Sequence, residues 1–208
     1  METLITLENV TKTYEDLCVL DHISLDLKRA ESIAFTGHNG CGKSTLLKLI
    51  AGLIPLSGGK IVRHEKIRFG YVPEKFPGMN IRMKDYLGVI AGIEGVEASE
   101  ADALVRDFFL EPMKNTKLHE LSKGSLQKVG VIQALLGRHD VLLLDEPLSG
   151  QDTDSQNVFL EKIHELRDRG VTILMSCHER KLIEELSDRK ITIEQGKLLC
   201  RESDEAGS

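Results

Sequence analysis

Hydrophobic positions follow two different periods along the chain, and together these predict a mixed α/β fold. Residues 2–36 and 57–73 carry short apolar runs with partial two-residue alternation, which predicts strands. Residues 76–120 carry apolar side chains near helical spacing between polar ones, which predicts helices. The unbroken apolar run at residues 141–144 is typical of a central parallel strand that is buried on both faces.

A glycine-rich segment lies between a short apolar run and a helical pattern. Residues 37–45 read G-H-N-G-C-G-K-S-T, after the apolar residues 32–36 and before the helical spacing of residues 44–51. Glycines at this spacing let backbone N–H groups approach phosphates, and the N-terminal end of the new helix attracts negative charge. The segment therefore predicts a nucleoside triphosphate site rather than a chance glycine-rich turn. The predicted contacts come from Gly37, His38, Asn39, Gly40, Cys41, Gly42, Lys43, Ser44 and Thr45.

Four side chains have predicted roles in the chemistry. Lys43 is expected to reach the β and γ phosphates, and Ser44 to place its hydroxyl on Mg²⁺. Asp145 and Glu146 end the apolar run, at the edge where ligands bind in open α/β sheets. Asp145 fits a carboxylate on the metal side, and Glu146 fits a base that orients or deprotonates the attacking water. The alternative, a strand that simply ends at a polar turn, is weaker because the phosphate loop is also present.

Residues 121–125 read L-S-K-G-S and resemble the signature of the ABC ATPases, which commonly reads L-S-G-G-Q. The leucine, the serine and the second glycine are kept, and Gln127 matches a glutamine often found just beyond them. The resemblance implies that Ser122 and Gly124 contact the γ-phosphate held by the opposite subunit of a dimer. The alternative interpretation is an ordinary helix cap. The place of the segment before the strand that ends at Asp145 favours the signature.

Other positions fall in the order that the family has. Tyr14 matches the aromatic residue that stacks on adenine, and a surface tyrosine at a strand end is the alternative. His178 matches the histidine that senses the γ-phosphate, which gives it a catalytic role beside Lys43. Asp152 matches the aspartate of a loop that crosses the dimer interface. Glu74 stands where most relatives have glutamine, and the resemblance implies that it contacts Mg²⁺, which accepts carboxylate oxygens. An exposed acid in a proline-marked turn is the alternative for Glu74.

The resemblance extends from Tyr14 to about Lys197 and implies a single ABC nucleotide-binding domain over residues 1–208. Such a domain has a P-loop NTPase core with a mostly parallel sheet, an antiparallel β subdomain and a helical subdomain that carries the signature. We expect the helical subdomain at about residues 76–125. The acidic residues 202–208 are expected to form a disordered tail.

The helical subdomain of the family also forms the groove that receives a coupling helix of the membrane partner. Phe76, Met79 and Met83 are candidate contacts in that groove. Packing in the core is an equal alternative for each of these apolar side chains.

Composition narrows the class of partner. The chain has 208 residues, a net charge of −6 and no basic block, so we expect no nucleic acid partner. It has no run of 18 apolar residues and no leader-like N-terminus, which predicts a cytoplasmic chain. The four cysteines lack metal-ligand spacing and are expected to be reduced thiols. Cys41 is either an inert small side chain or a thiol that bound nucleotide shields.

With the resemblance, these features predict the ATP-hydrolysing motor subunit of an ABC transporter. It would form a homodimer or heterodimer around two Mg-ATP molecules and drive a separate permease from the cytoplasmic face of the membrane. The L-S-K-G-S variant and Glu74 favour an exporter, because importers usually keep L-S-G-G-Q and glutamine. Two alternatives stay open: a soluble non-transport ABC ATPase, and a regulatory module with little hydrolysis. The presence of Glu146 and His178 argues against the regulatory module.

Overall fold

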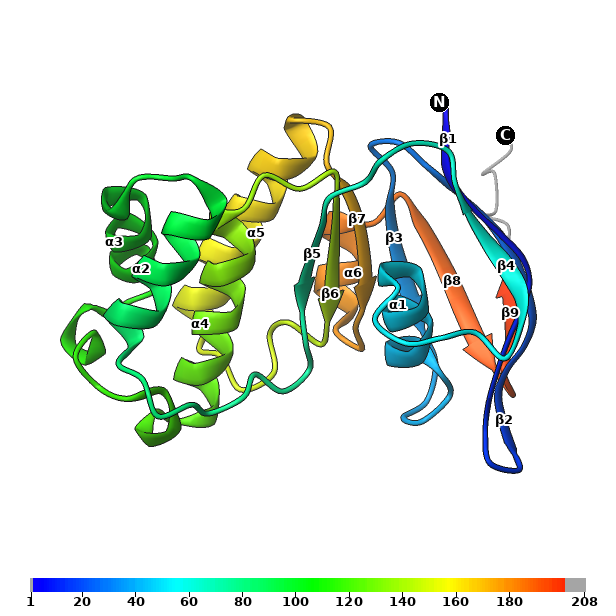
Figure 1. Cartoon of the computed structure of the whole chain (residues 1–208), viewed down its shortest axis with the longest axis horizontal. Helices are drawn as coiled ribbons and strands as arrows, with labels where there is room; N and C mark the ends of the chain where they lie inside the picture. Colours follow the sequence, from blue (N-terminus) through cyan, green and yellow to red (C-terminus); the bar gives the residue numbers. More distant parts are fainter. Residues whose placement is uncertain (1, 201–208) are drawn as a thin grey trace.

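The computed structural model describes residues 2–200 and shows two sheets flanked by helices (Figure 1). The larger sheet has six strands in the order β5-β6-β7-β3-β8-β9, and the smaller sheet has three in the order β2-β1-β4. Strands β5 to β8 of the larger sheet pair in parallel, whereas β9 pairs antiparallel with β8. The smaller sheet is antiparallel throughout. This confirms the predicted α/β class with a mostly parallel sheet and a separate antiparallel sheet.

The strands of the larger sheet are short. They are β3 (Ser32–Thr36), β5 (Phe69–Val72), β6 (Val141–Asp145), β7 (Thr172–Ser176), β8 (Arg189–Glu194) and β9 (Lys197–Cys200). Every residue of β3, β6 and β7 is buried, because helices or the smaller sheet cover both faces. Burial on both faces explains why these strands read as apolar runs instead of alternating patterns.

The smaller sheet consists of β1 (Thr3–Tyr14), β2 (Leu17–Lys28) and β4 (Gly58–Arg63). Buried and exposed residues alternate along most of β2, as expected for a sheet with one solvated face. In Figure 1 this sheet lies at one end of the molecule, and α2 and α3 lie at the other end.

Helix α1 packs on one face of the larger sheet, and the other helices belong to the hydrophobic cluster on its opposite face. The helices are α1 (Lys43–Ala51), α2 (Met83–Glu94), α3 (Ala98–Asp107), α4 (Lys123–Leu136), α5 (Thr153–Asp168) and α6 (Arg180–Leu186), with short 3₁₀ turns η1 (Glu111–Met113) and η2 (Leu118–Glu120). The predicted helical region 76–120 thus starts its first helix only at Met83. The sequence Pro77-Gly78 explains the delay, because proline and glycine both break helices.

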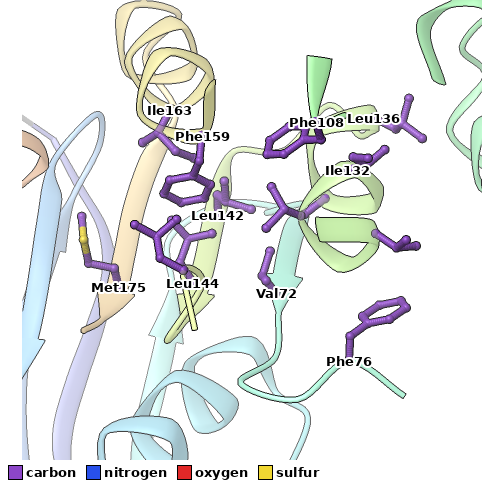
Figure 2. Packing of buried hydrophobic residues seen from close by; sticks show 14 of the residues in the cluster. Val72, Phe76, Phe108, Ile132, Leu136, Leu142, Leu144, Phe159, Ile163 and Met175 are labelled. Atoms are coloured by element: carbon purple, nitrogen blue, oxygen red, sulfur yellow. The ribbon is translucent and has the colours of Figure 1, made fainter. Parts of the chain in front are cut away.

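Two hydrophobic clusters cover the two faces of the larger sheet. Leu142 and Leu144 of β6 pack with side chains such as Phe159 of α5 in the first cluster, which also includes α4 and the helices beyond it (Figure 2). Val141 and Leu143 of the same strand belong to the second cluster, which joins the sheet to α1 and the smaller sheet. Alternate residues of β6 therefore pack into the hydrophobic clusters on the two faces of the sheet. This packing holds the end of β6 in place.

Two candidate contacts for a membrane partner lie in the core instead. Met83 is fully buried and Phe76 nearly so, with the Phe76 ring packed edge-on against Tyr86 at a centroid distance of 5.9 Å. Met79 is partly buried against the same cluster. The contact interpretation is therefore wrong for Phe76 and Met83, because their apolar surface is already removed from solvent.

Three earlier expectations concern the whole chain. No helix within residues 2–200 is long and apolar enough to cross a membrane. The predicted acidic tail at residues 202–208 lies outside the described residues. The boundaries of the predicted helical subdomain stay a prediction.

Candidate active site

Four segments of the predicted site leave the same edge of the larger sheet. Strands β5, β6, β7 and β3 are neighbours and run in parallel, so the segments that follow them emerge side by side. These segments carry Glu74, the pair Asp145 and Glu146, His178, and the glycine-rich loop. The strand order, rather than proximity in sequence, gathers these residues at the edge where open α/β sheets bind ligands.

A cavity of about 430 Å³ lies at this edge. Its volume falls in the range of small-molecule sites. It is lined by Asn39, Gly40, Gly42, Lys43, Ser44, Thr45, Glu74, Glu146, Ser149 and His178. All of these except Ser149 are predicted site residues, so the fold brings most of the predicted site together.

Glycines give the loop before α1 its shape. Gly37 and Gly42 have φ angles of 139° and 111°, which are strained for any residue with a side chain. A Cβ atom on Gly37 would overlap the carbonyl oxygen of Ile193, and one on Gly42 would lie 2.7 Å from Leu20 Cδ2. Gly42 is also the N-cap of α1, and no side chain within residues 2–200 caps that helix. The first N–H groups of α1 are thus left for a ligand, and they favour an anion.

Lys43 begins α1 and is held by the loop. Its Nζ donates to the carbonyl oxygens of Gly37, at 3.0 Å, and His38, at 3.3 Å. The same Nζ lies 3.1 Å from His178 Nε2. These contacts keep a nearly buried cation at the centre of the loop, where the helix end also favours negative charge.

Oxygen donors suited to a divalent cation lie beside the loop. Ser44 Oγ donates to Asp145 Oδ1 at 2.9 Å, although the two residues are 101 positions apart. Glu74 lines the same cavity. Hydroxyl and carboxylate oxygens are the ligand type that Mg²⁺ prefers. Ser44, Asp145 and Glu74 therefore fit the predicted metal role by their chemistry.

Glu146 follows the end of β6 in a left-handed backbone conformation, with φ at 47°. Burial raises the pKa of its carboxyl group to about 7. Lys43 opposes this effect, whereas the charges of Asp145 and Glu74 add to it. A base with a pKa near the working pH is well matched to proton transfer. The environment of Glu146 therefore suits the predicted role of general base.

His178 lies at the centre of the predicted catalytic groups. Its Nε2 is 2.9 Å from Asn39 Oδ1 and 3.2 Å from Glu146 Oε1. Burial and the charge of Lys43 lower the pKa of the imidazole, so the ring is neutral at pH 7. Its contact with Glu146 is thus a hydrogen bond between neutral imidazole and carboxyl group rather than an ion pair. His178 connects the glycine-rich loop to the predicted base.

Tyr14 and Cys41 do not line the cavity. Tyr14 ends β1 with 46% of its surface exposed, and the Nζ of Lys12 lies 4.7 Å from the centre of its ring. Its stacking on adenine stays a prediction. Cys41 is buried in the cluster of α1 and the smaller sheet, and a Cβ atom on Gly37 would come 2.7 Å from its Sγ. The thiol therefore faces the core, which favours the inert side chain over the shielded thiol.

Ser122 and Gly124 also lie outside the cavity of their own chain. Ser122 is the N-cap of α4, where its Oγ accepts the N–H of Ser125 at 3.1 Å. The helix-cap alternative thus describes the local role of Ser122 correctly. A Cβ atom on Gly124 would overlap the carbonyl oxygen of Gly150, so the first turn of α4 packs directly on the loop after β6. Contact of both residues with nucleotide on a second subunit stays a prediction.

Asp152 has two partners within its own chain. It caps α5 by accepting the N–H of Ser155 at 2.9 Å, and it pairs with Lys128 of α4 at 2.6 Å. The hydrogen bond from Lys128 lowers the pKa of Asp152 further than the other contacts do. The loop from β6 to α5 is thereby fastened to α4, and its predicted role at a dimer interface is untested.

Three residues near the predicted acids were missed in the sequence. Ser149 lines the cavity, Ser176 Oγ donates to Asp145 Oδ1 at 2.5 Å, and the Tyr71 hydroxyl donates to Asp145 Oδ2 at 3.2 Å. Burial raises the pKa of Tyr71, so its hydroxyl keeps the proton that it donates. The position of Ser176 at the end of an apolar run, two residues before His178, was the available signal.

Comparisons with known proteins agree with this geometry. The family model described as ABC transporter matches residues 20–149. The zinc import ATP-binding protein ZnuC of Vibrio cholerae is 38% identical over 99% of this chain and 79% of its own length. An uncharacterized ABC transporter ATP-binding protein of Methanocaldococcus jannaschii is 36% identical over 95% of this chain and 76% of its own.

Solved structures with similar folds carry related descriptions. An ATP-binding subunit of an ABC transporter aligns with a TM-score of 0.86 and 27% identity, over 97% of this chain and 90% of that one. A dimeric ATP-binding cassette with ADP and phosphate, in a post-hydrolysis state, also aligns with a TM-score of 0.86. Its identity is 22%, over 99% of this chain and 100% of that one, so it shows a shared fold alone.

Proposed function

The chain belongs to the ABC transporter family as an ATP-binding subunit with ATPase activity, and we propose that it is the motor of an importer whose permease is a separate chain. Relatives from several bacteria are named zinc import ATP-binding proteins, which supports import and makes zinc the first cargo to test. The names of these relatives therefore contradict the export that we predicted from the signature variant and Glu74. For the direction of transport, we give these names more weight than the two departures from the family pattern.

The observation that carries the proposed mechanism is the convergence of Lys43, Glu146 and His178 on one cavity beside Asp145. Lys43 and the first N–H groups of α1 bind the β and γ phosphates of ATP. Ser44, Asp145 and Glu74 hold Mg²⁺, which neutralises phosphate charge when it is bound.

Glu146 acts on the attacking water. Its carboxylate takes a proton as the water oxygen bonds to the γ-phosphorus. The bond between that phosphorus and the β–γ bridging oxygen breaks, and ADP leaves with the electron pair. The contact of His178 with Glu146 orients the base, and its contact with Asn39 fixes the imidazole against the loop.

The positions of Ser122 and Gly124 support a dimer. Both residues lie at the start of α4, outside the cavity of their own chain, and Ser122 is exposed. In a head-to-tail dimer they would complete the site of a second subunit, with two ATP molecules shared between two chains. The second subunit is either another copy or a related chain.

The catalytic assignment is tested with Glu146→Gln. Losing a general base typically slows a reaction by about 100-fold to 10,000-fold. We expect ATP turnover to fall by that amount while ATP binding persists, and the variant to accumulate as a dimer with ATP in size-exclusion chromatography. Turnover at the wild-type rate would contradict the role of Glu146, and failure of the wild-type chain to hydrolyse ATP would contradict the whole mechanism.

The transport assignment needs the native host. Cells in which Glu146→Gln replaces the wild-type chain should take up radioactive zinc more slowly than wild-type cells, with equal amounts of protein present. The tagged chain should co-purify from detergent-solubilised membranes with a protein of several membrane spans. Unchanged zinc uptake would contradict zinc as the cargo. Recovery with ribosomes or other non-membrane partners alone would support the non-transport alternative.

A further inference from the structure

We infer that Ser176, together with Tyr71, is a positioning residue that holds the Asp145 carboxylate in the orientation needed to bind the metal. The inference rests on the proposed function, because it concerns how that site prepares for Mg²⁺. Asp145 is only 1% exposed. A buried carboxylate is costly unless its oxygens accept hydrogen bonds, so the donors around it decide its orientation.

Ser176 contacts both acids of the site. It ends β7 directly beside Asp145 of β6, and it is fully buried. Its Oγ donates to Asp145 Oδ1 at 2.5 Å, and its carbonyl oxygen accepts the N–H of Glu146 at 3.0 Å. One residue therefore fixes the carboxylate of Asp145 and the backbone from which Glu146 projects.

Tyr71 holds the other oxygen from the opposite side of β6. It lies on β5, which pairs with β6 along the edge away from β7. Its hydroxyl donates to Asp145 Oδ2 at 3.2 Å. The two strands that flank β6 thus each donate a hydrogen bond to one oxygen of the Asp145 carboxylate. Rotation of the carboxylate would break both hydrogen bonds.

Ser44 differs from these two donors, although it also contacts Asp145. In the proposed site the Ser44 hydroxyl serves the metal as well, whereas the hydroxyls of Ser176 and Tyr71 act on the metal through Asp145. Mg²⁺ demands near-ideal octahedral geometry, so a carboxylate fixed beforehand loses less freedom when the metal binds. Groups that orient a metal ligand typically contribute 10-fold to 100-fold in metal affinity.

The test measures metal binding without turnover. In a Glu146→Gln background, the affinity for Mn²⁺ in the presence of ATP is measured by electron paramagnetic resonance for Ser176→Ala and Tyr71→Phe. We expect each to weaken Mn²⁺ binding by about 10-fold or more. Binding of ATP in EDTA should stay the same, because neither residue touches the phosphate loop in the proposed site. A purely structural role would weaken both measurements together.

The chain offers a matched control. Ser32 is also a fully buried serine, on the adjacent strand β3, and its hydroxyl has no hydrogen-bond partner among residues 2–200. Ser32→Ala removes the same atom without touching Asp145, so it should leave Mn²⁺ affinity unchanged. If Ser176→Ala does not fold, Tyr71→Phe alone decides the matter, because Tyr71 is only partly buried.

The outcomes separate this inference from the proposed function. Mn²⁺ affinities of Ser176→Ala and Tyr71→Phe within twofold of the Glu146→Gln parent would overturn the positioning role and leave the ATPase assignment intact. A parent chain that binds neither ATP nor Mn²⁺ with ATP would contradict the proposed function, and the positioning role with it.

Discussion

Burial raises the pKa of Glu146, the proposed general base, and the cost of that burial should be measurable as a loss of folding stability. The folded chain raises the pKa of Glu146 from its ordinary value of 4.5 to about 7, chiefly through burial. The folded state therefore keeps a proton that the unfolded chain releases. As the pH rises through this interval, the unfolded state releases its proton first, and its free energy falls relative to that of the folded state. Wild-type stability should fall from acid to neutral pH for this reason.

The magnitude follows from the two pKa values. One pKa unit corresponds to about 1.4 kcal/mol, so the full penalty above pH 7 is roughly 3 kcal/mol. At pH 5 the folded state keeps its proton and the unfolded state has lost most of its own, so the penalty is only about 1 kcal/mol. Glutamine is neutral at every pH, so Glu146→Gln should stabilise the nucleotide-free chain by roughly 3 kcal/mol at pH 8 and about 1 kcal/mol at pH 5.

Urea unfolding followed by circular dichroism, without nucleotide, measures both numbers. Glu161→Gln is a suitable control, because Glu161 is an exposed carboxyl on α5, where the same substitution should have little effect at either pH. The prediction concerns the difference between the two pH values. A stabilisation by Glu146→Gln that is equal at pH 5 and pH 8 would refute the argument that a desolvated charge is its source.

Two further predictions use simple binding and stability assays. Gly124→Ala should destabilise the chain by about 1–2 kcal/mol in thermal unfolding, because the new methyl group overlaps the carbonyl oxygen of Gly150. Gly92→Ala, on an exposed face of α2 with no neighbouring atoms within 4 Å, should instead be slightly stabilising, and equal effects at the two sites would contradict the packing argument. Tyr14→Ala should weaken ATP binding by the roughly 1–3 kcal/mol of a base stack while leaving inorganic tripolyphosphate binding unchanged, as measured by calorimetry. Equal losses for both ligands would show that Tyr14 does not contact the base.

Much of the fold could be predicted from local patterns, but the order of the strands could not. The buried strands β3, β6 and β7 are visible as apolar runs, and α2 and α3 as helical spacing. Strand order depends on pairing between segments that are far apart in sequence. Strand β3 comes before β5, β6 and β7 along the chain, yet it lies beside β7 in the sheet. The same limit applies to Phe76 and Met83, because an apolar residue in a helical region has the same sequence signal in a core and in a groove.

The site shows a similar division between local and long-range information. The glycine-rich loop and the acids at the end of β6 could be found because each is a contiguous motif. Ser176 and Tyr71 could not be assigned to Asp145, because their contacts depend on which strands flank β6. The raised pKa of Glu146 likewise comes from burial by the whole fold. The predicted roles of Ser122 and Gly124 came from family resemblance alone, because their expected contacts lie on a second subunit.

The charges around the cavity give an independent physical reason to expect a divalent cation. Among its described lining residues, Lys43 is the one cationic side chain at neutral pH, since the lowered pKa of His178 keeps that ring neutral. Glu74 and Glu146 line the same cavity, and Asp145 accepts a hydrogen bond from Ser44, which also lines it. A triphosphate carries several negative charges, so its entry beside these acids is unfavourable unless another cation accompanies it. Because glutamate rather than glutamine stands at position 74, we expect nucleotide binding to depend more strongly on Mg²⁺. We therefore propose that the departure of Glu74 from the family pattern concerns metal dependence rather than the direction of transport.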